Sequence, residues 1–264
     1  MALSITPLFS GSSGNAALIK TDNSKILVDA GVSGKRIEAA LSVIGENADD
    51  IKAILLTHEH SDHIQGAGVL SRKHDIPLYA TQLTWDALEG KLGKVQTKNM
   101  RAISKADFYI DDLLIEPFET PHDAADPVGY CVSASGRKIG IATDLGHFPQ
   151  HVEYRLHSCD LVLLESNHDS DMLIAGRYPY QLKQRIKSRR GHLSNDDAAQ
   201  AAVRLAAAGV SSILLGHLSQ ENNLEQLAFR TVTDALMARG LEPGRDFKLG
   251  LALRNQVTGE FHIK

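Results

Sequence analysis

The 264-residue sequence contains little cysteine and no long apolar run, and both absences narrow its class. Its two cysteines, Cys131 and Cys159, do not form a Cys-x-x-Cys pair, which argues against a disulfide scaffold and a cysteine-rich zinc site. No apolar stretch is long enough for a transmembrane helix. The first residues show no basic segment followed by an apolar core and a cleavage site. We therefore expect a cytoplasmic protein without a membrane partner.

A strong excess of charge is absent too. The formal net charge is -4 at pH 7, so the chain as a whole is not a polycation and any binding to nucleic acid must use a local patch. One basic segment exists, consisting of Arg177, Lys183, Arg185, Lys187, Arg189 and Arg190. Such a run is more often a solvated helix face than a binding site. Its position before a second functional candidate, described below, favours phosphate binding here.

Short apolar, β-branched runs predict a series of strands. They are 17–19, 26–28, 51–56, 76–79, 128–132, 139–142, 161–164, 213–215 and 247–253. Helical periodicity covers 37–43, 85–92, 196–208 and 224–237. No Pro/Gly/Ser-rich linker divides the chain, so we expect a single domain over residues 1–264. The order of elements predicts an α/β fold in which helices cover the outer faces of sheets.

Several predicted strands end in a residue that can bind a metal or move a proton. The five residues at or just after such ends are Asp29, His58, Asp144, Glu165 and His217. Loops at the edge of a sheet can carry polar side chains without burying them unpaired. We therefore expect one site assembled from several strand ends.

The most informative motif is the His-x-His-x-Asp-His cluster of His58, His60, Asp62 and His63, directly after an apolar run. Four potential ligands in six residues cannot all point at one ion from a single helix or strand. They can surround two adjacent ions if the chain turns sharply where the strand ends. Imidazole and carboxylate groups suit zinc, manganese or iron. Two such ions can activate water and bind the oxygens of a displacement reaction.

This motif and the later single ligands resemble the metallo-β-lactamase superfamily. The resemblance implies a four-layer αββα sandwich with two divalent ions, zinc or manganese, between the sheets. It also implies the residues that hold the two ions. One ion would be bound by His58, His60 and His122, the other by Asp62, His63 and His217, and Asp144 would bridge both. Asp29 resembles the superfamily's structural aspartate, although a turn residue is an equal alternative. His60 stands where the diiron flavoprotein branch has glutamate, which favours hydrolysis over redox chemistry.

A candidate proton donor lies outside the ligand set. His192 precedes a predicted helix whose N-cap is Ser194 or Asn195, and a helix N-terminus next to basic residues favours an anion such as phosphate. A surface histidine near a cap is the ordinary alternative. However, Glu165 together with Gly191–Ser194 resembles the tRNA 3′-processing nucleases of the superfamily. There, a glutamate orients a histidine that protonates the leaving oxygen, and imidazole can supply that proton near neutral pH.

A more specific resemblance is to the YycJ/WalJ group of bacterial exonucleases. Four segments carry it: Phe9–Asn15, Glu165–Asp169, Gly191–Asn195 and Gly216–Asn223. The resemblance implies 5′-directed hydrolysis of DNA by a metal-activated hydroxide, with His192, held by Glu165, as proton donor and Asp62 as a further catalytic candidate. Candidate substrate-binding residues are Ser13, Asn15, His168, Arg189, Arg190, Ser194 and Asn195. For His168, a structural role is equally plausible.

Three functions other than that of a DNA exonuclease are compatible with the sequence. A small-molecule phosphodiesterase acting on cyclic or dinucleotide phosphates would use the same chemistry and make the basic segment incidental. A thioesterase or lactonase of the glyoxalase type would need no proton donor at His192. A non-enzymatic metal-binding protein would need neither that residue nor an intact ligand set. The residues alone leave open DNA against RNA, zinc against manganese, and the oligomeric state.

Overall fold

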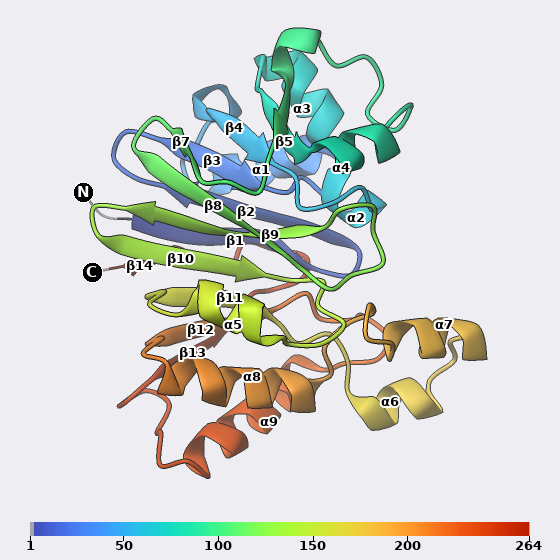
Figure 1. Cartoon of the computed structure of the whole chain (residues 1–264), viewed down its shortest axis with the longest axis vertical. Coiled ribbons are helices and arrows are strands. Elements are labelled where there is room, and N and C mark those ends of the chain that lie inside the picture. The colour runs from blue at the N-terminus through green and yellow to red at the C-terminus, as the bar shows by residue number, and fades with distance from the viewer. Residues whose placement is uncertain (1–2, 264) are drawn as a thin grey trace.

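Two seven-stranded sheets form the centre of the protein in a computed structural model that describes residues 3–263 (Figure 1). The first sheet has the spatial order β14 (Phe261–Ile263), β1 (Leu3–Gly11), β2 (Gly14–Lys20), β3 (Lys25–Val28), β4 (Ala53–Leu55), β5 (Leu78–Thr81) and β6 (Met100–Ile103). The second has the order β13 (Lys248–Leu251), β12 (Ser212–Gly216), β11 (Leu161–Glu165), β10 (Arg137–Ala142), β9 (Val128–Ala134), β8 (Leu113–Glu119) and β7 (Phe108–Ile110). Each sheet mixes parallel and antiparallel pairs.

The helices lie mainly outside the two sheets. Four follow strands of the first sheet: α1 (Gly34–Val43), α2 (Ser61–Ile64), α3 (Ala67–His74) and α4 (Gln82–Ala87). Five belong to the second half of the chain: α5 (Gln150–Leu156), α6 (Ser170–Ala175), α7 (Tyr180–Ile186), α8 (Asn195–Ala207) and α9 (Glu225–Met237). Two short 3₁₀ turns, η1 (Ala48–Asp50) and η2 (Thr97–Asn99), complete the set. Among the described residues, no helix has the length and apolar character needed to cross a bilayer.

Three apolar layers hold the sandwich together. Ile37 of α1 and Leu70 of α3 pack on the outer face of the first sheet. Tyr130 of β9 belongs to the layer between the two sheets. Leu205 of α8 and Val232 of α9 pack on the outer face of the second sheet. The predicted four-layer αββα sandwich is therefore confirmed (Figure 1).

Burial on both faces explains why the central strands read as unbroken apolar runs. In β11, Leu161 and Leu163 pack in the layer between the sheets, whereas Val162 and Leu164 pack against the outer helices. Successive side chains of a strand point to opposite faces, so a strand covered on both sides needs apolar residues at every position. In β12, Leu214 likewise packs between the sheets and Ile213 and Leu215 pack against the outer helices, whereas β10 begins with two basic residues that are not buried.

Several predicted boundaries differ from the observed ones, and local chemistry explains two of them. The strand predicted over 76–79 begins only at Leu78, because Pro77 has no N–H to give to a sheet. The helix predicted over 85–92 spans Gln82–Ala87 instead. Gly90 adopts a positive φ of 75°, which ends the helical path, while Leu88 and Leu92 stay buried and so account for the apolar periodicity.

Helices α6 and α7 form a protrusion that extends from one end of the sandwich, at the right of Figure 1. The chain leaves β11 at Glu165, passes through both helices and returns to the sandwich at α8. Lys183 Nζ donates to the carbonyl of Ile174 at 2.7 Å and so joins the two helices. The protrusion therefore lies between the two sequence segments that carry Glu165 and His192.

Candidate active site

Strand ends from both sheets converge on one site. Asp29 follows β3 and His58 lies three residues beyond β4, whereas Asp144 and His217 follow β10 and β12 of the second sheet. Asp29, Asp144 and His217 adopt left-handed backbone conformations, with φ of 61°, 59° and 55°. Such a conformation costs about 1–3 kcal/mol in a residue other than glycine. The fold therefore bears a local energetic cost at three of the strand ends that build the site.

The structure brings the seven predicted metal ligands together. Two triads, His58–His60–His122 and Asp62–His63–His217, each place their candidate ligand atoms within 4.8 Å of one another. Asp144 lies between them, with Oδ1 3.6 Å from His122 Nε2 and Oδ2 3.3 Å from His63 Nε2. One carboxylate oxygen thus approaches each triad, which is the arrangement that a bridging ligand requires.

Several ligand atoms have no hydrogen-bond partner although they are buried. His58 Nε2, His217 Nε2 and Asp144 Oδ2 are all in this state. A buried polar atom without a partner is costly, and orphaned imidazole nitrogens and carboxylate oxygens are the atoms that bind zinc or manganese. The donor set therefore fits divalent cations.

Asp29 holds part of the ligand loop in place. Its Oδ2 accepts a hydrogen bond from His63 Nδ1 at 2.7 Å, and its Oδ1 accepts one from the backbone N–H of Thr57 at 2.9 Å. A proton on Nδ1 leaves His63 Nε2 free as a ligand atom, which is how carboxylates commonly orient metal-binding histidines. Gly31 lets the loop approach closely, because a Cβ there would lie 1.6 Å from the backbone oxygen of Asp62. These contacts support the orienting role for Asp29 over that of a simple turn residue.

Glu165 connects the metal ligands with the candidate proton donor. Its Oε1 accepts from His217 Nδ1 at 2.7 Å and from His192 Nδ1 at 2.8 Å. Its Oε2 accepts from the backbone N–H groups of Leu145 at 2.7 Å and Leu193 at 3.2 Å. The carboxylate is fully buried and uses both oxygens twice. The same group therefore fixes the tautomer of a ligand and that of His192, leaving Nε2 of each ring for chemistry.

The electrostatic field of the site favours positive charge. Burial opposes the charged form of His217, but Asp144, Asp62 and Glu165 raise the pKa of His217 to about 10. Burial likewise opposes ionisation of Asp62, but His63 and His217 hold the pKa of that carboxyl well below its usual value. Carboxylates therefore stay ionised in a buried site, and divalent cations would balance their charge.

A cleft opens over these residues. One cavity of about 360 Å³ is lined by Asp144, His192 and His217 and by residues of the protrusion. A second cavity, of about 600 Å³, is lined by Ser13 and Lys91. The two cavities share the lining residues Ser12, His60, Ser61 and Asp62. They therefore form a continuous cleft that passes over the ligands.

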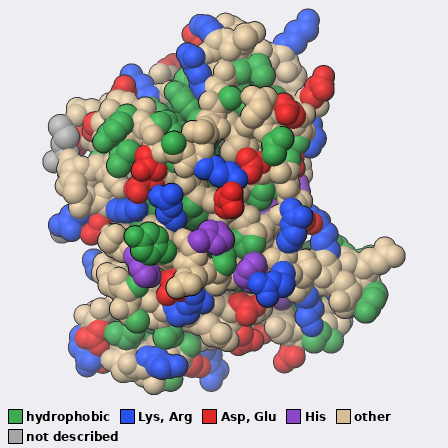
Figure 2. Space-filling model, in the orientation of Figure 1, with side chains coloured by type: hydrophobic (Ala, Val, Ile, Leu, Met, Phe, Trp, Pro, Cys, Tyr) green, Lys and Arg blue, Asp and Glu red, His purple; other side chains and the backbone are tan. Residues whose placement is uncertain are grey.

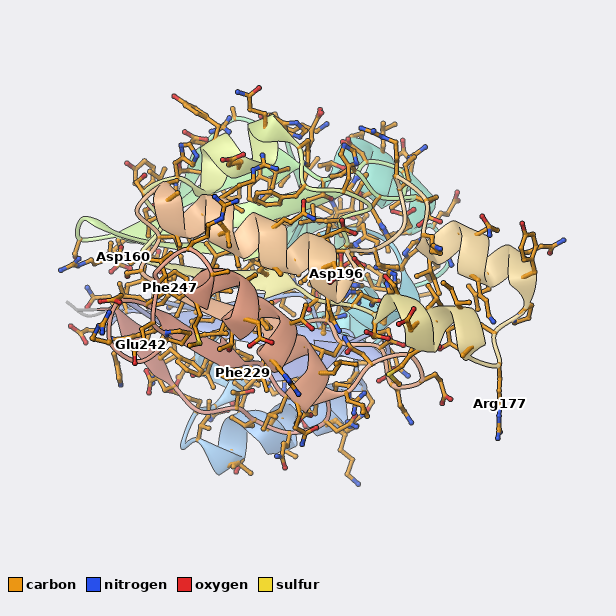
Figure 3. All side chains as sticks on the ribbon, turned by 90° about the horizontal axis from the view of Figure 1, so that it is seen from below. Asp160, Arg177, Asp196, Phe229, Glu242 and Phe247 are labelled. Carbon is orange, nitrogen blue, oxygen red and sulfur yellow. The ribbon has the colours of Figure 1, made fainter. Side chains whose placement is uncertain are left out.

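The basic segment does not form one exposed patch. Arg185 makes a two-pronged ion pair with Asp123, and Arg190 Nε donates to the carbonyl of His122 at 3.0 Å. These two arginines therefore anchor the protrusion to the loop that carries a ligand. Arg177 instead points away from the rest of the molecule (Figure 3). Basic, acidic and histidine side chains are intermixed on the face in Figure 2.

The anion site predicted at the start of α8 is not supported. Ser194 and Asp197 form a reciprocal capping box, in which Ser194 Oγ accepts from the Asp197 N–H at 3.1 Å. The N–H of Asn195 donates to the carbonyl of His168 at 2.8 Å. The first turn also carries the carboxylates of Asp196 and Asp197. The helix end is thus satisfied by its own residues, and its negative charge disfavours phosphate.

The predicted substrate-binding residues fall into two groups. Ser13, Arg189 and Arg190 are exposed, and Ser13 lines the larger cavity. Four others are buried: Asn15, His168, Ser194 and Asn195. Asn15 Nδ2 donates to the Asp62 carbonyl at 3.3 Å. Asn195 is hydrogen-bonded to the side chains of Ser166 and Asn223. Burial lowers the pKa of His168 to about 4. Substrate contact by these four stays a prediction, and their burial favours a supporting role.

Sequence reasoning missed the cleft residues of the protrusion. Tyr178, Leu182 and Ile186 line the smaller cavity, together with Arg185. Leu182 and Ile186 stand four residues apart and therefore share one face of α7. That spacing was the available signal, but a helix of seven residues is too short for a clear periodic pattern.

A "Beta-lactamase superfamily domain" model matches residues 24–218, and the chain therefore belongs to that superfamily of metal-dependent hydrolases. The solved structure of the metallo-beta-lactamase fold protein YhfI from Bacillus subtilis has a TM-score of 0.74 and 16% identity, with 100% of both chains covered. Two relatives are similar over nearly the whole chain. Exodeoxyribonuclease YycJ of Bacillus anthracis is 40% identical, over 94% of this chain and 95% of its own. Exodeoxyribonuclease WalJ of Streptococcus pneumoniae is 43% identical, over 92% of this chain and 91% of its own.

Proposed function

We propose that this protein is a 5′-directed DNA exonuclease that requires two divalent metal ions. The observation that carries the proposal is the position of His192, which lines the cleft beside the ligands while Glu165 holds its Nδ1 at 2.8 Å. Hydrolysis of a phosphodiester expels an alkoxide, which is a poor leaving group and needs a proton, whereas a thioester expels a thiolate, which can leave without one. The names of the two relatives support DNA as the substrate.

Each group of this chain has a separate task in the reaction. Bound to the two triads and Asp144, divalent ions would supply an activated water and offset the charge of the phosphate. His58, His60 and His122 would hold one ion, and Asp62, His63 and His217 the other. To act as the acid, His192 must carry a proton on both ring nitrogens: Nδ1–H stays bonded to Glu165, which offsets the positive charge of the ring, and Nε2–H faces the cleft and gives its proton to the leaving oxygen. Asp29 keeps His63 oriented through the contact at 2.7 Å.

The position of His192, together with the size of the smaller cavity, supports the 5′ direction. His192 lines the smaller cavity, and the larger cavity beside it has no His192 in its lining. The leaving group must lie next to its proton donor, so the leaving nucleotide occupies the smaller cavity. With the 3′ oxygen as leaving atom, that nucleotide is the one at the 5′ end. A volume of about 360 Å³ lies near the lower limit of roughly 300–1,000 Å³ for ligand pockets and suits one nucleotide.

The test compares wild-type protein with His192→Ala on end-labelled DNA, after metal removal and addition of Mn²⁺ or Zn²⁺. We expect metal-dependent release of nucleotides from the 5′ end, slowed about 10²- to 10⁴-fold in His192→Ala while metal binding persists. His262→Ala is the matched control, because His262 is exposed on β14. Release from the 3′ end would refute the direction. Turnover of a cyclic or dinucleotide phosphate without DNA degradation would favour the small-molecule phosphodiesterase, and turnover of a thioester or lactone alone would exclude both.

A further inference from the structure

The smaller cavity has an apolar wall as part of its lining. Tyr178, Leu182 and Ile186 of the protrusion supply it, whereas most of the remaining lining is polar or charged. Tyr178 and Leu182 are half-buried, so each keeps part of its surface available to a ligand. A nucleotide has the same two-sided character, because its phosphate is charged and its base offers a flat π surface. The cavity is therefore complementary to one nucleotide, with the polar side at the phosphate.

The apolar wall is fixed relative to His192. The backbone carbonyl of Ile186 accepts from the N–H of His192 at 2.9 Å, which ties the end of α7 directly to the proton donor. Arg185 is paired with Asp123 beside the ligand His122. The wall and the reacting groups are thus held by the same backbone segments, and a base against the wall lies at a set distance from the proton donor.

We propose that Tyr178, with Leu182 and Ile186, forms a stacking site for the terminal nucleobase of the strand. This inference rests on the proposed nuclease function. It assigns the leaving nucleotide's base to the protrusion and its 3′ oxygen to His192. Every base has a π face, so stacking accepts any base and discriminates only against its absence. The site accordingly positions the strand end without reading its sequence.

The experiment uses two oligonucleotides that differ only at the 5′ end, where one carries a normal nucleotide and the other an abasic tetrahydrofuran nucleotide. A 3′ label reports removal of the first nucleotide. For the wild-type protein we expect KM to be about 5- to 100-fold higher for the abasic end, from the usual contribution of aromatic–base stacking. Tyr178→Ala should bring this ratio close to one. Tyr178→Phe, which keeps the ring, should retain it.

Tyr180→Ala is the matched control, because Tyr180 lies two residues away at the start of α7 and is 75% exposed. It should keep the wild-type ratio, and thermal melting verifies that each variant is folded. A wild-type ratio of one, or an unchanged ratio in Tyr178→Ala, would overturn the stacking site while leaving the nuclease intact. Wild-type protein that hydrolyses bis(p-nitrophenyl) phosphate but no DNA would refute the proposed function, and the stacking site with it.

Discussion

Glu165→Gln separates the two roles that the structure gives to this buried carboxylate. Oε2 accepts from two backbone N–H groups and Oε1 from two imidazole rings. Backbone N–H groups cannot become acceptors, so the amide oxygen of glutamine must face them. The amide NH₂ then faces His192 and His217, which can accept only if each ring moves its proton from Nδ1 to Nε2. His217 would thereby lose the atom that is available to a metal.

The size of the effect follows from these four contacts. Hydrogen bonds to a charged group contribute about 1.5–3 kcal/mol and neutral ones about 0.5–1.5 kcal/mol. Loss of the charge at four contacts therefore removes about 4–6 kcal/mol of unfolding free energy, from a usual total of about 5–15 kcal/mol. A protein of this size should melt roughly 8 °C lower or more. Loss of an orienting partner typically weakens metal binding about 10- to 100-fold.

Three measurements test this reasoning. Chelator competition gives the metal affinity, thermal melting gives the stability, and ¹⁵N NMR of the zinc-loaded protein shows which ring nitrogen of His217 carries the proton. Wild-type protein should carry it on Nδ1. Glu89→Gln, at an exposed position, is the control for the same chemical change. Unchanged zinc affinity and an unchanged His217 tautomer in Glu165→Gln would show that Glu165 does not set the ligand's proton.

Three further outcomes are expected. Asp29→Asn should weaken metal binding about 10- to 100-fold by removing the charged partner of His63, and equal affinity by calorimetry would exclude that role. Gly31→Ala should cost about 3 kcal/mol or more in urea unfolding, since its Cβ would lie 1.6 Å from a ligand-loop carbonyl, whereas Gly90→Ala, in open space, should cost only about 1–2 kcal/mol. Burial lowers the pKa of His74, but the carboxylates of Glu38 and Asp49 outweigh this effect and raise that pKa above its usual value. The ion pairs of protonated His74 therefore contribute fully to the unfolding free energy below a pH of about 6.5, and this contribution is lost as pH rises through the elevated pKa. His74→Gln should accordingly destabilise the protein more at pH 5.5 than at pH 9.

The central fold was predictable because burial on both faces leaves a plain mark in the sequence. Leu161–Leu164 and Ile213–Leu215 were identified as strands on that basis, and both are strands. Two strands at sheet edges, β6 and β14, give no such signal. In β6, three of the four residues are exposed, and β14 is only three residues long. Their pairing depends on partners far away in the chain, such as Leu3 with Ile263, and local patterns do not encode this.

The clustering of the candidate ligands was predictable for a different reason, since these residues are concentrated in a short motif and at a few strand ends. What the sequence could not show is which polar groups already satisfy one another. The α8 N-terminus was expected to bind an anion, but Ser194 and Asp197 cap it. Arg185 was expected in a patch for phosphate, but it is paired with Asp123. Such pairings depend on side-chain geometry and on loops that meet only after folding.

The convergence of ligands from both sheets has a consequence for the mechanics of the chain. An ion held by Asp62, His63 and His217 would link the first half of the chain to the second, closing a loop that includes much of both sheets. It would thus act as a reversible cross-link, and links across long loops restrict the unfolded chain most. Metal availability would then govern how long the folded protein survives proteases as well as how fast it works.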